Sequence, residues 1–365
     1  MQDSEYESFL TFPDLIADYR RAVRQVETEV VGEFQKNNDD LVKIKKAALE
    51  SERAHRNLLN LCVTPFTEEF QGCRDLGYEF FRASPLAEKN VSNFDFLIAR
   101  LFPADKPAIL ILGEAKASVG NPSTVVKMIA KKREIADAAS DYILEKYLKQ
   151  APHRSVIIES VVAVDSVDSS NMVAAVVDSG EDIKVWHGPS TGQETISLAT
   201  PPKGTPDYAK YLHKEHKLNS LLERLPSLRR TFDVWPQTHP LIQLGGLLAC
   251  TRQIENVNVV TLASLEAVIR HDMFYLNDSE REAMAMNTIQ KGISIGFLTP
   301  TEVPSEYRIV SVGVRTSVLE RTLEEKWLKW QLDQDQQKEI TARLEKLREE
   351  FSKKRKGRKT VEEFS

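Results

Sequence analysis

Cysteine is scarce in this chain: among 365 residues only Cys62, Cys73 and Cys250 occur, and no CxxC pair is formed. This scarcity disfavours a disulfide framework or a cysteine-based zinc site and is typical of a reducing cytoplasm. No apolar run reaches the ~18 residues of a membrane span. The acidic start MQDSEYESFL also lacks the basic and apolar regions of a signal peptide. We therefore expect a cytoplasmic protein without a membrane partner.

Several motifs of known chemistry are also missing. The chain contains no GxxxxGK[ST], GxGxxG or GxSxG segment, so neither a nucleotide-driven motor nor a serine hydrolase is indicated. The net charge of −5 excludes a general polyanion binder. Two basic runs nevertheless occur, KMIAKKR at 127–133 and KKRKGR at 353–358. Such runs are usually solvated faces, but a local positive field can still bind nucleic acid.

The middle of the chain predicts an α/β domain. Three strand-like segments with short loops between them predict an antiparallel meander, and helical and strand patterns then alternate. Strands are expected at 78–84, 93–101, 108–117, 155–165 and 182–188, and helices at 121–150 and 170–180. Asn121 is a good N-cap, and Pro122 suits the first helical turn. An α/β fold class follows from this order of elements.

The segments around this domain are mostly helical. Residues 14–60 predict helices, and an apolar stripe over 62–76 predicts one amphipathic helix with Glu69 inside the stripe. Two helical patterns and a hairpin between 262 and 314 are compatible with a winged-helix fragment, although many folds share that pattern. Residues 319–351 show coiled-coil-like apolar spacing.

These patterns divide the chain into four predicted regions. They are an N-terminal helical region at 1–60, an α/β core with insertions at 61–260, a possible winged-helix-like DNA-recognition region at 261–318, and an amphipathic helix with a basic tail at 319–365.

Charged residues stand at the end of a core strand. Glu114 and Lys116 follow the apolar run AILIL and the residue Gly113. Side chains two positions apart in a strand share a face, so the two charges are expected side by side. Asp182/Lys184, Glu215/Lys217 and Glu324/Lys326 have the same spacing, and a surface ion pair is the ordinary explanation. Only the first pair follows a core strand and precedes a capped helix.

A second acid sharpens this interpretation. Asp95 lies within the apolar segment SNFDFLIARL, where an aspartate is costly without a partner or a metal. If the two strands pair, Asp95 and Glu114 converge, and close carboxylates repel unless a cation lies between them. Mg²⁺ prefers one or two carboxylates together with substrate phosphate, and Lys116 could orient an attacking water. The parts describe metal-assisted hydrolysis of a phosphodiester.

Asp95 and the Glu114-Ala115-Lys116 tripeptide, within a helix–β–β–β–helix–β order, resemble the PD-(D/E)XK nuclease superfamily. About 130 of the 365 residues share the resemblance, and Phe94 stands where the motif has proline. The resemblance implies a restriction-endonuclease-like core with a mixed central sheet flanked by helices. It also implies a Mg²⁺-dependent cut of DNA, with Asp95 and Glu114 as metal ligands and Lys116 positioning the water. Family members often add a glutamate from the preceding helix, a role that Glu69 matches; a solvent-facing Glu69 is the alternative.

The leading hypothesis is therefore a type II restriction endonuclease that cuts double-stranded DNA as a homodimer, since symmetric cleavage of two strands requires two active centres. The amphipathic C-terminal helix is a candidate subunit contact, and the basic tail could hold the DNA backbone. One alternative is a repair, recombination or mobile-element nuclease of the same fold. The other is a non-catalytic DNA-binding or assembly protein.

Overall fold

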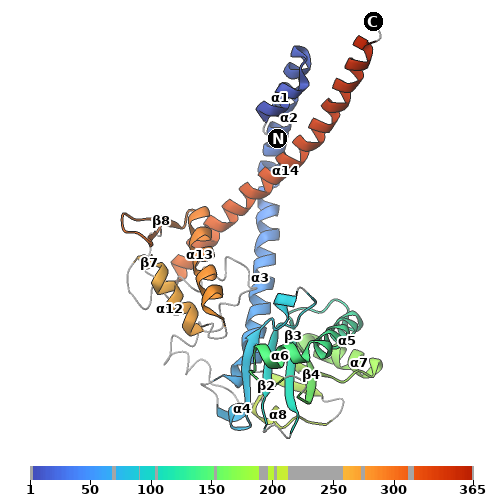
Figure 1. Ribbon diagram of the computed structural model, residues 1–365, viewed down its shortest axis with the longest axis vertical. Helices are drawn as coiled ribbons and strands as arrows, with labels where there is room; N and C mark the ends of the chain where they lie inside the picture. The colour runs from blue at the N-terminus through green and yellow to red at the C-terminus, as the bar shows by residue number, and fades with distance from the viewer. Residues whose placement is uncertain are drawn as a thin grey trace. The chain divides into compact units, whose positions relative to one another are not determined.

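The computed structural model describes residues 3–67, 71–89, 91–102, 106–151, 154–188, 196–200, 204–212, 258–272, 276–310 and 316–363. The chain forms two compact units (Figure 1). One consists of Met1–Ala48, Ile295–Phe297 and Ser311–Ser365, and the other of Leu49–Ser294 and Leu298–Val310. No helix in these ranges is both long and apolar enough to span a membrane.

The larger unit is built on a mixed sheet, which confirms the predicted α/β class. Its strands follow the sheet order β1-β2-β3-β4-β5-β6. They span Tyr78–Ala83, Phe96–Arg100, Ala108–Lys116, Val156–Val164, Ile183–His187 and Ser197–Thr200. The first three strands pair antiparallel, as the short loops predicted, whereas β3-β4 and β4-β5 pair parallel. Strand β6 returns antiparallel to β5.

Helices connect the parallel strands because a parallel crossover needs a long connection. Helices α5 (Pro122–Ala138) and α6 (Ser140–Lys146) join β3 to β4, and α7 (Ser169–Ser179) joins β4 to β5. The Thr124 N–H donates to Asn121 Oδ1 over 3.1 Å, which confirms the predicted N-cap of α5. Short 3₁₀ helices span Ala87–Lys89 and Ser166–Asp168.

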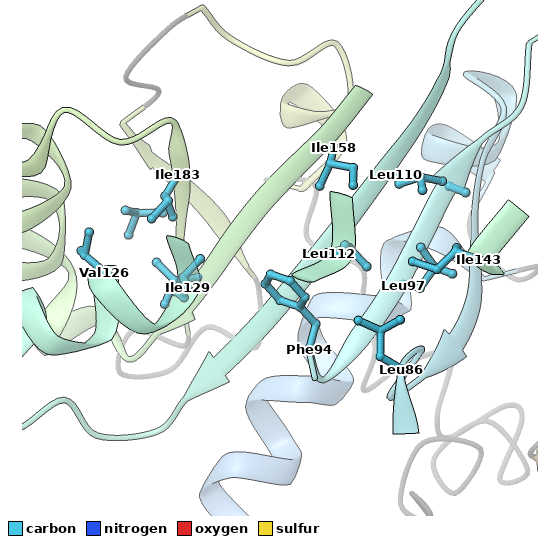
Figure 2. Packing of buried hydrophobic residues seen from close by; sticks show 14 of the residues in the cluster. Leu86, Phe94, Leu97, Leu110, Leu112, Val126, Ile129, Ile143, Ile158 and Ile183 are labelled. Atoms are coloured by element: carbon cyan, nitrogen blue, oxygen red, sulfur yellow. The ribbon is translucent and has the colours of Figure 1, made fainter. Parts of the chain in front are cut away.

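Both faces of the sheet are buried. One face, with Leu110 and Leu112 of β3, packs against Val126 and Ile129 of α5, as Figure 2 shows. The opposite face, with Ile109 and Ile111, packs against α3 (Asn38–Val63) and α8 (Ala209–Leu212). Because β3 is covered on both sides, its sequence is a continuous apolar run rather than an alternation.

The single helix predicted over 62–76 is wrong. Helix α3 ends at Val63, a 3₁₀ turn spans Thr64–Phe66, and the short helix α4 spans Gln71–Asp75. Pro65 explains the break, since proline lacks the N–H that a continuing α-helix requires and clashes with the preceding turn. Gly77, at φ 87°, lies in the left-handed region as a helix stop does.

A smaller sheet follows in the same unit. Strand β7 (Val259–Thr261) is followed by helices α12 (Leu262–Asp272) and α13 (Asp278–Ser294) and by the strands β8 (Leu298–Pro300) and β9 (Glu306–Ile309). The strand order is β7-β9-β8, and β8 and β9 form the predicted hairpin. Two helices and a hairpin are thus present, as the winged-helix hypothesis requires. Arg82 of β1 donates to Glu280 of α13 over 2.8 Å, which ties this part to the larger sheet.

The other unit is a helical arm. Helices α1 (Asp3–Leu10) and α2 (Pro13–Lys36) pack on the long helix α14 (Thr316–Glu363), as Figure 1 shows. Arg343 pairs with Glu33 and Arg358 with Asp14, each at 2.5 Å, so α2 and α14 run antiparallel. Apolar residues of α14, among them Leu344 and Phe351, pack on α1 and α2 of the same chain.

This packing bears on the predicted basic tail and subunit contact. Arg355 lies 4.0 Å from the centre of the Phe9 ring, and Arg358 pairs with Asp14. Part of the run KKRKGR therefore holds α1 and the start of α2, and part of the apolar stripe of α14 is used within the chain. The DNA contact of the tail and the homodimer contact of α14 stay predictions.

Candidate active site

Glu114 is a buried carboxylate at the end of the central strand β3. It is 3% exposed and lies on the sheet face of Leu110 and Leu112. Lys116 Nζ donates to Glu114 Oε1 over 2.6 Å, while the Lys116 side chain stays 31% exposed. The predicted neighbours are therefore in contact, with the acid inside and the lysine reaching solvent. Burial of a carboxylate is costly unless it is paired, so the contact stabilises Glu114 in this position.

Lys132 is a second partner of Glu114 that the sequence analysis missed. Its Nζ donates to Glu114 Oε2 over 2.5 Å from the third turn of α5, and its side chain is only 10% exposed. The ammonium group also lies 5.8 Å from the centre of the Phe94 ring. The position of Lys132 within an apolar helix face is the feature of the sequence that could have predicted its burial. The basic run KMIAKKR nevertheless reads as a solvated surface, because it contains Lys127 and Lys131, which are exposed.

Asp95 lies directly before β2, at the edge of the pairing with β3. The pairing begins with Phe96 opposite Gly113, and the Asp95 N–H donates to the Gly113 carbonyl over 2.9 Å. The Ala115 N–H donates to Asp95 Oδ2 over 2.8 Å, which fixes the carboxylate against β3. The predicted pairing of the two strands is thus confirmed, and the convergence of the Asp95 and Glu114 carboxylates stays a prediction. Each carboxylate is held by different partners.

The close pairing of these strands depends on Gly113. The ring of Phe96 lies over this glycine, and a Cβ added there would be 1.8 Å from Phe96 Cζ. The same ring stacks on Trp186 with 6.1 Å between centroids. Glycine before Glu114 is therefore a packing requirement of the strand that presents the acid.

His55 of α3 is the partner of Asp95 and was also missed. Its Nε2 is buried and lies 3.5 Å from Asp95 Oδ2. The Asp95 carboxylate raises the pKa of His55 above its usual value, with a further contribution from Glu52, while burial and Lys116 oppose this shift. The charges of Glu52 and Lys116 therefore both act on the His55 imidazole. A histidine contact made from a distant helix leaves no local pattern in the sequence.

The predicted helical glutamate, Glu69, lies outside the described residues. The thiol of Cys62, one turn of α3 beyond Leu58, is buried among apolar residues. Burial raises the pKa of Cys62 well above its usual value, and Asp95 adds to the shift. Burial likewise raises the pKa of Cys73 to about 12. Both thiols are therefore protonated at neutral pH and are poor nucleophiles.

The residue types at this site fit Mg²⁺, whereas their present partners do not leave a ready cage. Asp95 and Glu114 offer the hard oxygen donors that Mg²⁺ prefers. Both oxygens of Glu114 accept from lysines. Within the described part of the chain, no group of three or more His, Cys, Asp or Glu side chains is arranged to hold a metal ion. Binding would require a lysine to move or a substrate to bring negative charge.

Comparison of the chain with known protein families, with proteins of described function and with solved structures finds no match. The interpretation of the site therefore depends on its own geometry and chemistry.

Proposed function

We propose that the protein is a Mg²⁺-dependent DNA endonuclease of PD-(D/E)XK type, with its active centre at Asp95, Glu114 and Lys116. One observation carries the proposal: Glu114 is buried at the end of the central strand, with Lys116 reaching solvent beside it and Asp95 held against the same strand from the residue before β2. The helix α3, the meander β1-β2-β3, the helix α5 and the parallel strand β4 follow the order that the family resemblance implies.

Each residue has a role in hydrolysis. Asp95 and Glu114 would hold the Mg²⁺ ion, which when bound acts as a Lewis acid on the phosphodiester and lowers the pKa of its water. Lys116 would orient the attacking water and offset charge that develops on the phosphate. Water adds to phosphorus and one P–O bond breaks, leaving a phosphate monoester and a hydroxyl. The Ala115 N–H and His55 orient the Asp95 carboxylate.

Exposed lysines on α5 support an anionic substrate. Lys127 and Lys131 are exposed one helical turn apart on α5, the helix that also carries Lys132. Positive side chains of this kind contact phosphates and position DNA without reading its sequence. The winged-helix-like part is less favourable, since residues 258–310 contain seven acidic and four basic residues. A role of that part in recognition would depend on contacts with bases rather than on general attraction to DNA.

In its more specific form, the proposal is a restriction endonuclease. Such an enzyme would cleave double-stranded DNA at a specific sequence and would act as a homodimer. A nuclease core needs fewer residues than this chain has, so the arm and the winged-helix-like part are available for recognition and association. A repair, recombination or mobile-element nuclease would share Asp95, Glu114 and Lys116, and only the choice of substrate would separate it.

A second candidate is a non-catalytic DNA-binding or assembly protein. The two lysines on Glu114 favour it, because they satisfy the carboxylate without a metal ion. In that case the same site would bind phosphate but would not cleave it. Cleavage of DNA therefore distinguishes the nuclease from the non-catalytic protein.

The test is incubation of the purified protein with long unmethylated DNA and Mg²⁺, followed by sequencing of the ends. Cleavage that EDTA stops is the expected result, and discrete fragments indicate a restriction enzyme whereas a smear indicates a nonspecific nuclease. Glu114→Gln is expected to abolish cleavage, and Asp182→Asn, an acid with the same spacing to a lysine on β5, is the matched control. Intact DNA in every form tested would favour the non-catalytic candidate.

A further inference from the structure

Glu114 has two lysine partners although the proposed chemistry uses one. Lys116 is partly solvated, but Lys132 is enclosed, with its ammonium group against Glu114 Oε2 and near the Phe94 ring. A buried ammonium requires a compensating charge, and Glu114 provides it. Lys132 thus neutralises Glu114 from inside the protein, whatever Lys116 does at the surface.

The charge of Glu114 is already offset without a metal ion. Glu114 contributes one negative charge, and Lys116 and Lys132, paired with its two oxygens, contribute two positive charges. A site prepared for a free divalent cation has an excess of carboxylates, whose mutual repulsion the ion relieves. Glu114 and its two lysines have no such excess, whereas a DNA phosphate would bring negative charge of its own.

We propose that Lys132 is a positioning residue that makes metal binding at this site depend on bound DNA. The inference rests on the proposed function and adds an order of binding to it. In the free protein, Lys132 holds the inner oxygen of Glu114 and opposes a divalent cation. Phosphate bound near Lys116 and the exposed lysines of α5 supplies the negative charge that lets a divalent cation bind. Such an order would limit metal-dependent chemistry to the DNA complex.

The experiment is calorimetric titration with Ca²⁺, which binds oxygen donors, in the presence and absence of a short DNA duplex. For the wild-type protein, we expect the duplex to tighten Ca²⁺ binding at least about tenfold. Lys132→Met is expected to bind Ca²⁺ about tenfold more tightly than wild type without DNA, because one positive charge near a divalent ion has been removed. Lys132→Arg retains the charge and should behave as wild type.

Lys184→Met is the matched control, since it removes another buried lysine of the same sheet, 6% exposed and paired with Asp182. Its Ca²⁺ affinity should equal that of wild type. A Lys132→Met protein with wild-type Ca²⁺ affinity would overturn the role of Lys132 even if the enzyme cleaves DNA. If that variant does not fold, equal affinity of the wild type with and without the duplex has the same meaning. Unchanged Ca²⁺ binding of the DNA complex in Asp95→Asn would instead overturn the proposed metal site.

Discussion

Two acid–X–lysine tripeptides lie on strands of the same sheet, and their burial is reversed. At the end of β3 the side chain of Glu114 is 4% exposed and that of Lys116 is 31% exposed. At the start of β5 the side chain of Asp182 is 39% exposed and that of Lys184 is 7% exposed. In both, the lysine donates to the acid, over 2.6 Å and 3.1 Å respectively. Equal spacing in the sequence thus gives opposite arrangements in the fold.

The difference arises from the faces of the sheet. Glu114 lies on the face covered by α5, which supplies Lys132 as a second partner. Lys184 lies on the other face with Trp186, near the half-buried Glu159. A buried acid with a solvent-reaching lysine can receive an anionic substrate, whereas a buried lysine with an exposed acid satisfies the interior. In a candidate catalytic pair, the lysine therefore reaches solvent and the acid is buried. In a structural pair, the acid reaches solvent and the lysine is buried.

The largest effect expected from this comparison is on cleavage. Lys116→Met should lower the cleavage rate at least about a hundredfold, because the proposed positioning of water and the neutralisation of charge are both lost. DNA binding should change little, since Lys127 and Lys131 remain. Cleavage rates and binding curves measured on the same plasmid check both expectations.

Lys184→Met provides the contrast, because it changes the corresponding lysine of the other tripeptide. At a temperature where it is folded, this variant should cleave at nearly the wild-type rate. Equal losses in both variants would mean that general stability, and not the position of Lys116, limits the reaction.

The next effect concerns the stability of the fold and the glycine before Glu114. Gly113→Ala should destabilise the fold by about 3 kcal/mol, because the new Cβ meets the Phe96 ring inside a packed core. Gly120→Ala, in the loop after β3, is the control, since nothing lies within 4 Å of its added Cβ. Urea unfolding of the two variants measures the difference. A Gly113→Ala protein as stable as wild type would mean that Phe96 moves freely and that β2 and β3 are not locked together at Asp95.

Local patterns predicted the strands of the larger sheet well. The apolar run before Glu114 and the Asn-Pro start of α5 each reflect chemistry within a few residues, and the structure has β3 and α5 where they were expected. The strand predicted at 93–101 is shorter, Phe96–Arg100, so Asp95 precedes it, and the helix predicted at 121–150 is divided into α5 and α6. Lys132 and His55 were missed because their contacts join segments distant in the chain. The helix predicted through Thr64–Phe66 is wrong because Pro65 ends the α-helix although the apolar spacing continues.

The sequence patterns also did not predict which helices pack against each other when they are distant in the chain. The spacing of 319–351 predicted an amphipathic helix, and α14 spans that range without a break. Its partner on the arm, α2, lies at the other end of the chain. Many amphipathic helices could satisfy the same apolar stripe, so periodicity predicts the helix and leaves its partner open.

The smallest expected effect tests the interior role of the Lys184 side of the sheet. Burial raises the pKa of Glu159 above its usual value, against the hydrogen bond from the Tyr208 hydroxyl and the charge of Lys184. An acid whose pKa is raised by folding stabilises the fold at low pH and loses that contribution as the pH rises through the folded pKa. Glu159→Gln should therefore gain stability relative to wild type between about pH 4 and pH 7, a trend that urea midpoints measured across this range would show. Asp178→Asn, exposed on α7, should follow the wild-type curve. Parallel curves for wild type and Glu159→Gln would mean that Lys184 and Tyr208 fully offset the partial burial of Glu159.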